Sequence, residues 1–327
     1  MKRIGVILLC GFLLCSCGVE KTTDKSDKEK VVLEKREDEK YFTIEGDTLI
    51  KYKGGFEKSA EIVLPQRVRK IAKGAFVLSK SERKNSSGQL ATVKLTIPSN
   101  VELEPYAFEK MGPMEVEFEE GRTKIEAYAF CGAINDGKRY TSKIKLPNSL
   151  KTLEKHCFDT EEWLIVNLGD GIEKIEDYAL NGCDWDCLPS SLRAIGKRAL
   201  GENGELTLPE GVERIGYQAA EELQVKVKIP SSVKSISPGA FVWSENAEEE
   251  GYVVDKQNRN YKNDEHGALY SKDGKILYFA TFYHTAHLEI PDGVEVVYKE
   301  QLYTTRDSFA KVSIRGLDKV KIKKIKR

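Results

Sequence analysis

Residues able to do chemistry stand in several places along this chain, but none forms a complete catalytic or metal-binding signature. His284 and His287 are spaced as H-x-x-H in an apparent strand or loop, where positions i and i+3 face opposite sides, and no H-E-x-x-H glutamate accompanies them. Asp184 and Asp186 flank Trp185 and are the one carboxylate pair to inspect. The G-x-S-x-G, Walker and G-x-G-x-x-G motifs are absent from the sequence. We therefore expect no enzyme activity, no cofactor and no metal.

A column of polar and aromatic residues is the one candidate binding site. Each member stands just before the Ala or Cys of a recurring x-Ala-Phe tail, so stacked repeats would bring the members into line on one side of the molecule. We call this column the ladder, and its residues are Tyr106, Tyr128, His156, Tyr178 and Arg198. Such a ribbon could bind sugars or peptide. The alternative is that the Tyr side chains pack against the backbone of the next turn.

The ladder depends on an internal repeat of about 20–29 residues. In residues 206–241 one pattern occurs twice, with Pro209 and Pro230 placed 21 positions apart. Insertions at 79–89 and 133–142 lengthen two repeats. Eight repeats align by two positions. The first is the residue before the Pro or its equivalent, and the second is the apolar residue four positions before the Ala or Cys of the tail. The pairs are Leu64 with Ile71, Ile97 with Leu103, Phe118 with Ile125, Leu146 with Leu153, Leu168 with Ile175, Leu188 with Ile195, Leu208 with Ile215, and Ile229 with Ile236.

Each repeat begins with a short alternating strand. Val225, Val227 and Ile229 point to one face and fill the core. Pro230 ends the strand because proline has no N–H to donate a hydrogen bond to a neighbouring strand. No repeat buries its apolar face alone, so stability comes from its neighbours. The pattern predicts a right-handed leucine-rich-repeat solenoid, mostly β with short helical turns.

The sequence motif P-x-x-V-x-x-I-x-x-x-A-F resembles the BspA-like class of leucine-rich repeats, found on bacterial surface and secreted proteins. Residues 42–52 resemble that family's N-terminal cap hairpin, and residues 252–277 resemble its inserted hairpin, with the resemblance covering roughly 41–302. It implies a cap at 41–56, repeats at 57–246, an inserted hairpin block at 247–286, and a last repeat with C-terminal cap at 287–327. The family is associated with adhesion, so the resemblance implies protein or glycan binding without catalysis.

The N-terminal segment is typical of a bacterial lipoprotein. A charged start and a short apolar run form a signal at 1–16, which ends in a lipobox-like Leu14-Cys15-Ser16 before Cys17. Cys17 is then the lipidated residue, and acylation anchors the protein to the membrane. The alternative is an ordinary secretory signal. Residues 17–40 are charged and poor in apolar side chains, which predicts a flexible tether.

The cysteines of the body are expected to pack in the core. This applies to Cys131, Cys157 and Cys183, since free Cys is among the most buried residue types. Cys183 and Cys187 leave a local disulfide open as an alternative in an oxidising compartment. A zinc site is not expected, because no second pair stands at ligand spacing.

Charge excludes one class of partner. Lys+Arg and Asp+Glu are 52 each, and removal of Lys2 and Arg3 with the signal leaves 50 against 52, so the whole protein has no electrostatic reason to bind nucleic acid. The basic run 319–327 predicts an end-capping strand. We expect a monomeric, non-catalytic lipoprotein of the cell envelope, with the outer membrane or cell surface favoured. The alternatives are a periplasm-facing structural or assembly partner and, as a weaker one, an enzyme with an acidic site.

Overall fold

The computed structural model describes the body of the chain, and Leu33–Arg327 forms one compact unit. The signal segment, Cys17, His284 and the residues of the tether before Leu33 lie outside the described residues. No helix among the described residues is long and apolar enough to span a bilayer. The described ranges are 33–56, 58–77, 91–133, 141–160, 164–201, 206–220, 227–241, 252–265, 267–279, 287–298 and 313–323.

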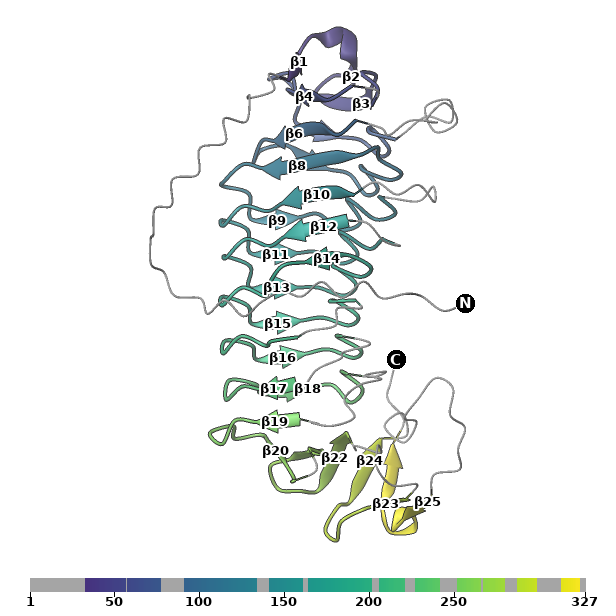
Figure 1. Cartoon of the computed structure of the whole chain (residues 1–327), viewed down its shortest axis with the longest axis vertical. Coiled ribbons are helices and arrows are strands. Elements are labelled where there is room, and N and C mark those ends of the chain that lie inside the picture. Colours follow the sequence, from purple (N-terminus) through teal and green to yellow (C-terminus); the bar gives the residue numbers. More distant parts are fainter. Residues whose placement is uncertain are drawn as a thin grey trace, which may run out of the picture. The chain divides into compact units, whose positions relative to one another are not determined.

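In most of the described repeats the opening strand pairs in parallel with the opening strand of the next repeat (Figure 1). Within the described residues this gives a seven-stranded sheet in the order β1-β4-β6-β8-β10-β12-β14. β17 (Val227–Ile229) and β19 (Tyr252–Val254) pair in the same way. The seven strands are β1 (Glu34–Arg36), β4 (Ala60–Ile62), β6 (Val93–Ile97), β8 (Met114–Phe118), β10 (Ser142–Lys145), β12 (Leu164–Asn167) and β14 (Asp184–Trp185).

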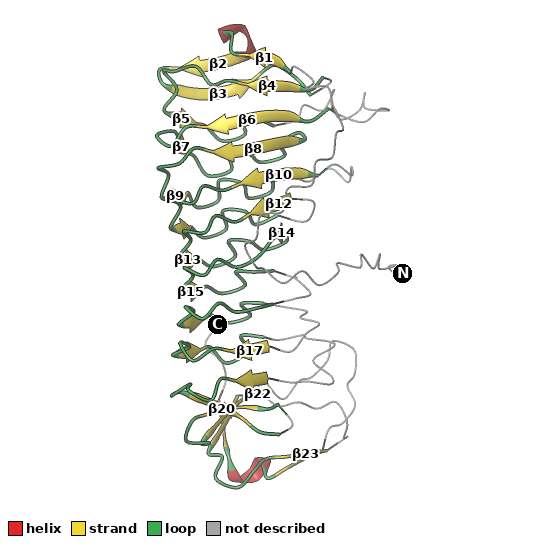
Figure 2. Ribbon diagram, turned by 60° about the vertical axis from the view of Figure 1, so that its left-hand side comes forward, coloured by secondary structure: helices red, strands yellow, loops and turns green. Residues whose placement is uncertain are grey.

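The apolar residue of each tail lies on a strand of only two residues, and six of these strands form a second parallel sheet (Figure 2). Its Ile and Leu side chains are buried and face the core. The first two of these strands, β5 (Lys70–Ile71) and β7 (Glu102–Leu103), instead continue a sheet that starts with the hairpin β2 (Phe42–Glu45) and β3 (Thr48–Tyr52). The others are β9 (Lys124–Ile125), β11 (Thr152–Leu153), β13 (Lys174–Ile175), β15 (Ala194–Ile195), β16 (Arg214–Ile215) and β18 (Ser235–Ile236).

The core contains a column of phenylalanines, one from each of four consecutive tails. The rings of Phe76 and Phe108 stack with centroids 5.0 Å apart, those of Phe108 and Phe130 at 4.2 Å, and those of Phe130 and Phe158 at 5.1 Å. All four are fully buried. Aromatic pairs at such separations add to the stabilisation that comes from burial alone. The tail residue predicted to fill the interior therefore also links each turn to the next.

The ordered body begins earlier than the sequence predicted, which corrects the boundary of the tether at 17–40. Glu34–Arg36 is strand β1, and Glu39–Tyr41 is a 3-10 turn, η1. Arg36 is buried, and its Nη1 donates to Tyr52 Oη at 2.6 Å and to the carbonyl oxygens of Gly54 and Gly55 at 2.6 and 2.9 Å. A charged residue in a polar stretch is ordered here because the cap hairpin offers it three acceptors.

Two further expectations need correction. The short helical turns predicted for the repeats are not present in the described repeats. The helical elements of the described chain are η1 and η3 (Leu317–Lys319), and both lie outside the repeats. Residues 206–208 were expected to form a strand, but no strand is assigned there, although Leu206 and Leu208 are buried as the alternation requires. The alternating side chains are therefore buried even where no β-sheet pairing is formed.

The C-terminal block contains the inserted hairpins and the closing strands. β20 (Tyr261–Asn263), β21 (Leu269–Ser271) and β22 (Ile276–Phe279) are antiparallel neighbours, and parallel pairing then adds β24 (Val296–Tyr298) and β26 (Lys321–Lys323). β23 (His287–Glu289) pairs with β25 (Ser313–Arg315). The basic run at the C-terminus thus supplies the last strand of its sheet.

We predict that Phe130→Ala destabilises the fold by about 3–5 kcal/mol, because it deletes a fully buried ring from the middle of the phenylalanine column. Urea denaturation followed by circular dichroism measures the change. Phe130→Leu is the control and should cost clearly less, since the turns at Leu180 and Leu200 already accommodate leucine at this position. Equal losses for the two variants would contradict a structural role of the aromatic column.

Candidate functional site

Every ladder residue occupies the third position of a tight turn. The turn before Ala107 is closed by a bond of 3.0 Å from the Ala107 N–H to the carbonyl oxygen of Glu104, and the turns before Ala129, Cys157 and Ala179 are closed in the same way. The third residue has a positive φ, whereas the second does not. These are the features of a type II β-turn, in which glycine is the unstrained choice at the third position.

The ladder therefore places bulky side chains where the backbone favours glycine. Gly74 and Gly239 hold this position at the two ends of the repeat series, with φ of 64° and 76°. A non-glycine residue in this region costs on the order of 1–3 kcal/mol. The turns between them carry non-glycine residues, at Tyr106 (φ 64°), Tyr128 (63°), His156 (55°), Tyr178 (59°), Arg198 (49°) and Gln218 (50°).

Hydrogen bonds between turns hold this strained position in place. The N–H of Tyr106 donates to the carbonyl oxygen of Tyr128 at 2.7 Å, that of Tyr178 donates to Lys197 at 2.8 Å, and that of Gln218 donates to Gly239 at 2.8 Å. The same bond recurs at every ladder residue. The surrounding structure thus fixes both the backbone conformation and the vertical spacing of the ladder.

Four of the five predicted ladder residues form a continuous stack. The ring centroids of Tyr106 and Tyr128 lie 5.6 Å apart, those of Tyr128 and His156 lie 4.7 Å apart, and those of His156 and Tyr178 lie 4.6 Å apart. The two pairs that include His156 are almost parallel, with interplanar angles of 7°. All four side chains are half-buried. The rings therefore cover one another's faces, and their edges remain toward solvent.

Arg198 does not continue the stack of rings. Its Nε donates to Gln218 Oε1 at 3.0 Å, and Gln218 occupies the same position one turn further on. Gln218 belongs to the column and was not among the predicted site residues. The recurrence of a residue just before the Ala of each tail was the signal that could have included it.

His156 is held by a hydrogen-bond chain that the sequence did not suggest. Its Nδ1 lies 2.7 Å from Asp159 Oδ2, and the other carboxylate oxygen accepts a bond of 2.8 Å from Asn181 Nδ2. Asp159 lies only three residues after His156, whereas Asn181 follows the tail of the next repeat, so the spacing of residues alone does not reveal the complete chain. The chain fixes the plane of the imidazole between the two tyrosines.

Lysines cover the ladder from neighbouring turns. Lys73 Nζ lies 4.9 Å from the ring centroid of Tyr106, Lys155 Nζ lies 5.8 Å from that of Tyr128, and Lys197 Nζ lies 5.5 Å from that of Tyr178. Cations at this range are attracted by the ring quadrupole. The ladder consequently has a positive border.

Carboxylates of the repeat are used to cap backbone N–H groups of the turn before. A Glu follows the tail Ile or Leu, as at Glu104, Glu154 and Glu176, and each accepts a bond from the second residue of the preceding type II turn, at 3.2, 3.0 and 3.1 Å. Pro105 has no N–H at that position, and the Glu126 that would cap it pairs instead with Arg122 at 2.9 Å. These acids are structural.

The other predicted chemistry also serves structure. Trp185 Nε1 donates to the carbonyl oxygen of Leu200 at 3.1 Å, and Asp186 Oδ1 accepts from the N–H of Leu168 at 3.0 Å, so Trp185 and Asp186 of the acidic candidate each hold a neighbouring turn. Asp184 is exposed. The described residues contain no cluster of three His, Cys, Asp or Glu able to hold a metal ion.

Cys157 and Cys183 are buried thiols, as the packing hypothesis predicted, and burial raises the pKa of each. Cys183 Sγ donates to the carbonyl oxygen of Phe158 at 2.9 Å, while Cys187 is exposed, so the structure does not join these two cysteines. Cys131 is partly buried.

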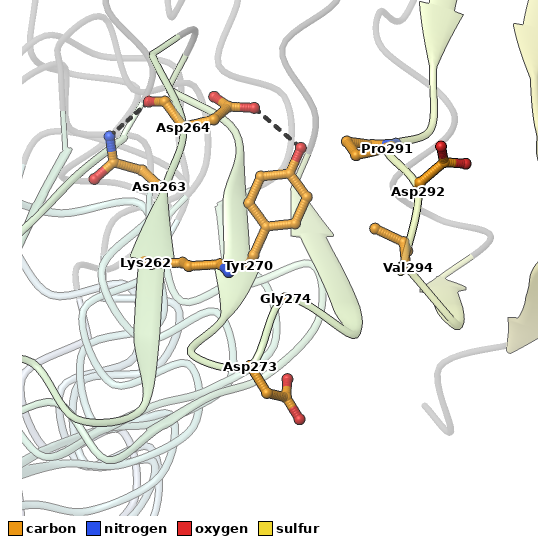
Figure 3. A pocket seen from close by; sticks show the side chains of 10 residues that line it. Lys262, Asn263, Asp264, Tyr270, Asp273, Gly274, Pro291, Asp292 and Val294 are labelled. Carbon is orange, nitrogen blue, oxygen red and sulfur yellow. Dashed lines mark hydrogen bonds between the residues drawn. The ribbon is translucent and has the colours of Figure 1, made fainter.

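A cavity of about 260 Å³ lies in the C-terminal block, between the inserted hairpins and residues 291–294 (Figure 3). Tyr270 Oη donates to Asp264 Oδ2 at 3.0 Å, and the N–H of Ala268 donates to Asp264 Oδ1 at 2.9 Å. Burial, and then the neighbouring carboxylate, raise the pKa of Tyr270. The Asp264 carboxylate is thus engaged in holding the hairpin together.

We predict that Tyr128→Gly leaves the protein more stable than Tyr128→Ala, by about 1 kcal/mol. Both variants lose the ring contacts, but only glycine relieves the left-handed strain. Thermal unfolding of the two variants measures the difference. Ala127→Gly is the matched control, because residue 127 does not have a positive φ and glycine should destabilise it. Alanine proving the better residue at 128 would contradict the argument.

Comparison with known proteins agrees with this architecture. Six copies of the BspA type leucine rich repeat region match the chain, over residues 86–199 and 135–248. No curated protein matches. A leucine-rich repeat protein from Eubacterium ventriosum ATCC 27560 is 23% identical, with a TM-score of 0.35, over 56% of this chain and 43% of its own.

The pneumococcal vaccine antigen PcpA is 16% identical, with a TM-score of 0.29, over 78% of this chain and 57% of its own. The chain thus spans 43% and 57% of the length of these two proteins. The family match and the stacked parallel turns confirm the predicted fold. The chain is a leucine-rich-repeat protein of the BspA type.

Proposed function

We propose that this protein is a non-catalytic lipoprotein of the cell envelope, anchored through Cys17, whose solenoid binds a protein or glycan ligand along the ladder. The anchor is supported by the sequence alone, through the lipobox-like residues before Cys17 and the polar stretch that follows. The ladder is supported by the geometry of the described turns.

One observation carries the binding role. The three tyrosines and the histidine stand at a backbone position where glycine would be free of strain, in four consecutive turns. Strained backbone held by its surroundings is a pointer to function. Stacking offsets part of the cost, at about 0.5–1.5 kcal/mol for each aromatic pair. The remaining strain is explained if these side chains also serve a ligand.

The stack limits how a ligand can approach. Because Tyr128, His156 and Tyr178 cover each other's faces, a sugar ring cannot lie flat on the middle of the ladder. The solvent-facing edges offer phenolic hydroxyls and imidazole nitrogen at the spacing of successive turns, and these groups donate and accept hydrogen bonds. A ligand is therefore recognised by hydrogen bonding to the ring edges.

We predict that replacing Tyr106, Tyr128 and Tyr178 together by Phe leaves the fold intact and weakens ligand binding about tenfold or more. The rings and their stacking are retained, while three hydroxyls that each contribute about 0.5–1.5 kcal/mol are lost. Binding to a glycan array and a panel of envelope proteins measures the effect. Tyr298→Phe, in the C-terminal sheet, is the control. Unchanged binding by the triple variant would exclude the ladder as the contact surface.

We predict that antibody labels the protein on intact cells, and that Cys17→Ala is released from the cell because its lipid attachment is gone. Cell fractionation and labelling before and after permeabilisation measure both points. Labelling only after permeabilisation would favour the alternative, a periplasm-facing structural or assembly partner. Retention of Cys17→Ala on the cell would exclude lipid anchoring at this residue.

A further inference from the structure

A groove of about 460 Å³ crosses the outer face of the two-residue strands from β13 to β18. Its floor includes Gly196 and Gly216, which follow the buried Ile195 and Ile215. We call it the glycine groove. Its polar walls come from residues on either side of these glycines, namely Lys155, Lys174, Glu176, Asp177, Arg214, Ser235 and Ser237.

The groove exists because the column of capping carboxylates stops. Glu104, Glu154 and Glu176 fill the position after the tail Ile or Leu in earlier turns. At Gly196 a Cβ atom would lie 2.6 Å from the backbone nitrogen of Asp177, and at Gly216 it would lie 2.5 Å from the carbonyl carbon of Gly196. The turns approach too closely here for any side chain, so the space above two consecutive turns stays open.

The acidic side chains around the groove are engaged by other groups, which leaves cationic side chains without a close carboxylate partner among the described residues. Glu176 is engaged by Lys174 Nζ at 2.5 Å and by the N–H of Lys155, and Asp177 Oδ1 accepts from the N–H of Lys197 at 2.7 Å. In the described part of the chain no carboxylate lies within ion-pair distance of Lys155 Nζ. Among the described residues, the carboxylate that pairs with Arg214 is that of Glu213, at 3.9 Å, and the Arg214 side chain is 62% exposed.

The lining also decides the class of macromolecule. The groove crosses the face of the sheet and reaches its end strand β18, but over β13, β15 and β16 the strands are already paired on both sides, so a peptide lying there cannot add as a further strand. Its only large apolar side chains, those of Ile175, Ile195 and Ile215, are buried in the core and form no pocket for a peptide anchor. Ser235 and Ser237 add hydroxyls beside the cations. The exposed groups thus match a chain rich in hydroxyls and carboxylates.

We propose that the glycine groove binds an acidic polysaccharide, with its carboxylates toward Lys155 and Arg214 and its hydroxyls toward the serines and Glu176. The inference rests on the proposed binding function, because it adds a second contact surface to that function and names the ligand class for this surface. The groove adjoins the ladder, since Lys155 lines the groove and its Nζ also lies 5.8 Å from the ring centroid of Tyr128, but the other cation, Arg214, does not contact the stacked rings. The phenolic hydroxyls of the ladder and the charges of the groove are different groups, so the two can still be tested with separate variants.

The test measures binding of the full-length protein to polygalacturonate by isothermal titration calorimetry at low ionic strength. Lys155→Gln/Arg214→Gln should weaken binding roughly three- to tenfold, because each exposed charge pair contributes modestly. Added salt should weaken it further. The charge-matched control is Lys143→Gln/Lys228→Gln on β10 and β17, exposed positions of the strands that open the repeats, and it should bind like the unchanged protein.

Neutral dextran and poly-glutamate complete the experiment. Binding of dextran as tightly as polygalacturonate, or tighter binding of poly-glutamate, would overturn the proposed ligand class. Equal weakening by the two double variants, or no binding of polygalacturonate to the unchanged protein, would overturn the site. The triple Phe variant of the ladder should keep its affinity for polygalacturonate, so a failure of the groove and a failure of the ladder are distinguishable.

Discussion

The left-handed residue in each type II turn is the constraint on which the rest of the structure depends. It reverses the chain after the two-residue strand, and its N–H bonds to the turn that follows. The tail Phe two residues later then enters the core, while the ladder side chain stays at the surface. One backbone conformation thereby sets two aromatic columns, an inner one from Phe76 to Phe158 and an outer one from Tyr106 to Tyr178.

The two aromatic columns differ in how far their rings are buried. The inner rings are fully buried and bring apolar area together, which is where most stabilisation of a repeat array arises. The outer rings are half-buried and keep polar edges accessible. The Glu side chains of the early turns accept hydrogen bonds from backbone N–H groups. Where Gly196 and Gly216 replace them, a groove opens in the surface that these side chains fill in the earlier turns.

Much of this architecture could be predicted from the sequence, because strict spacing of apolar residues fixes which side chains face the core. The register of all eight repeats, the cap hairpin and the ladder follow from it. The second sheet did not, since two-residue strands such as Lys174–Ile175 leave no alternation to detect. The left-handed turns were missed although Gly74 and Gly239 mark them at the ends. Contacts such as Asp159 with His156 or Arg36 with Tyr52 depend on side-chain direction, which periodicity does not encode.

The bonds of Arg36 have a mechanical consequence. A pull on the chain ahead of Leu33 reaches the folded body first at strand β1, where the guanidinium is bonded to Tyr52 and to two carbonyl oxygens of the cap hairpin. These contacts and the parallel pairing of β1 with β4 must both break before β1 separates from the body. Because each turn is bonded only to its neighbours, failure beyond this clasp proceeds turn by turn, and the extension per event is one repeat of chain.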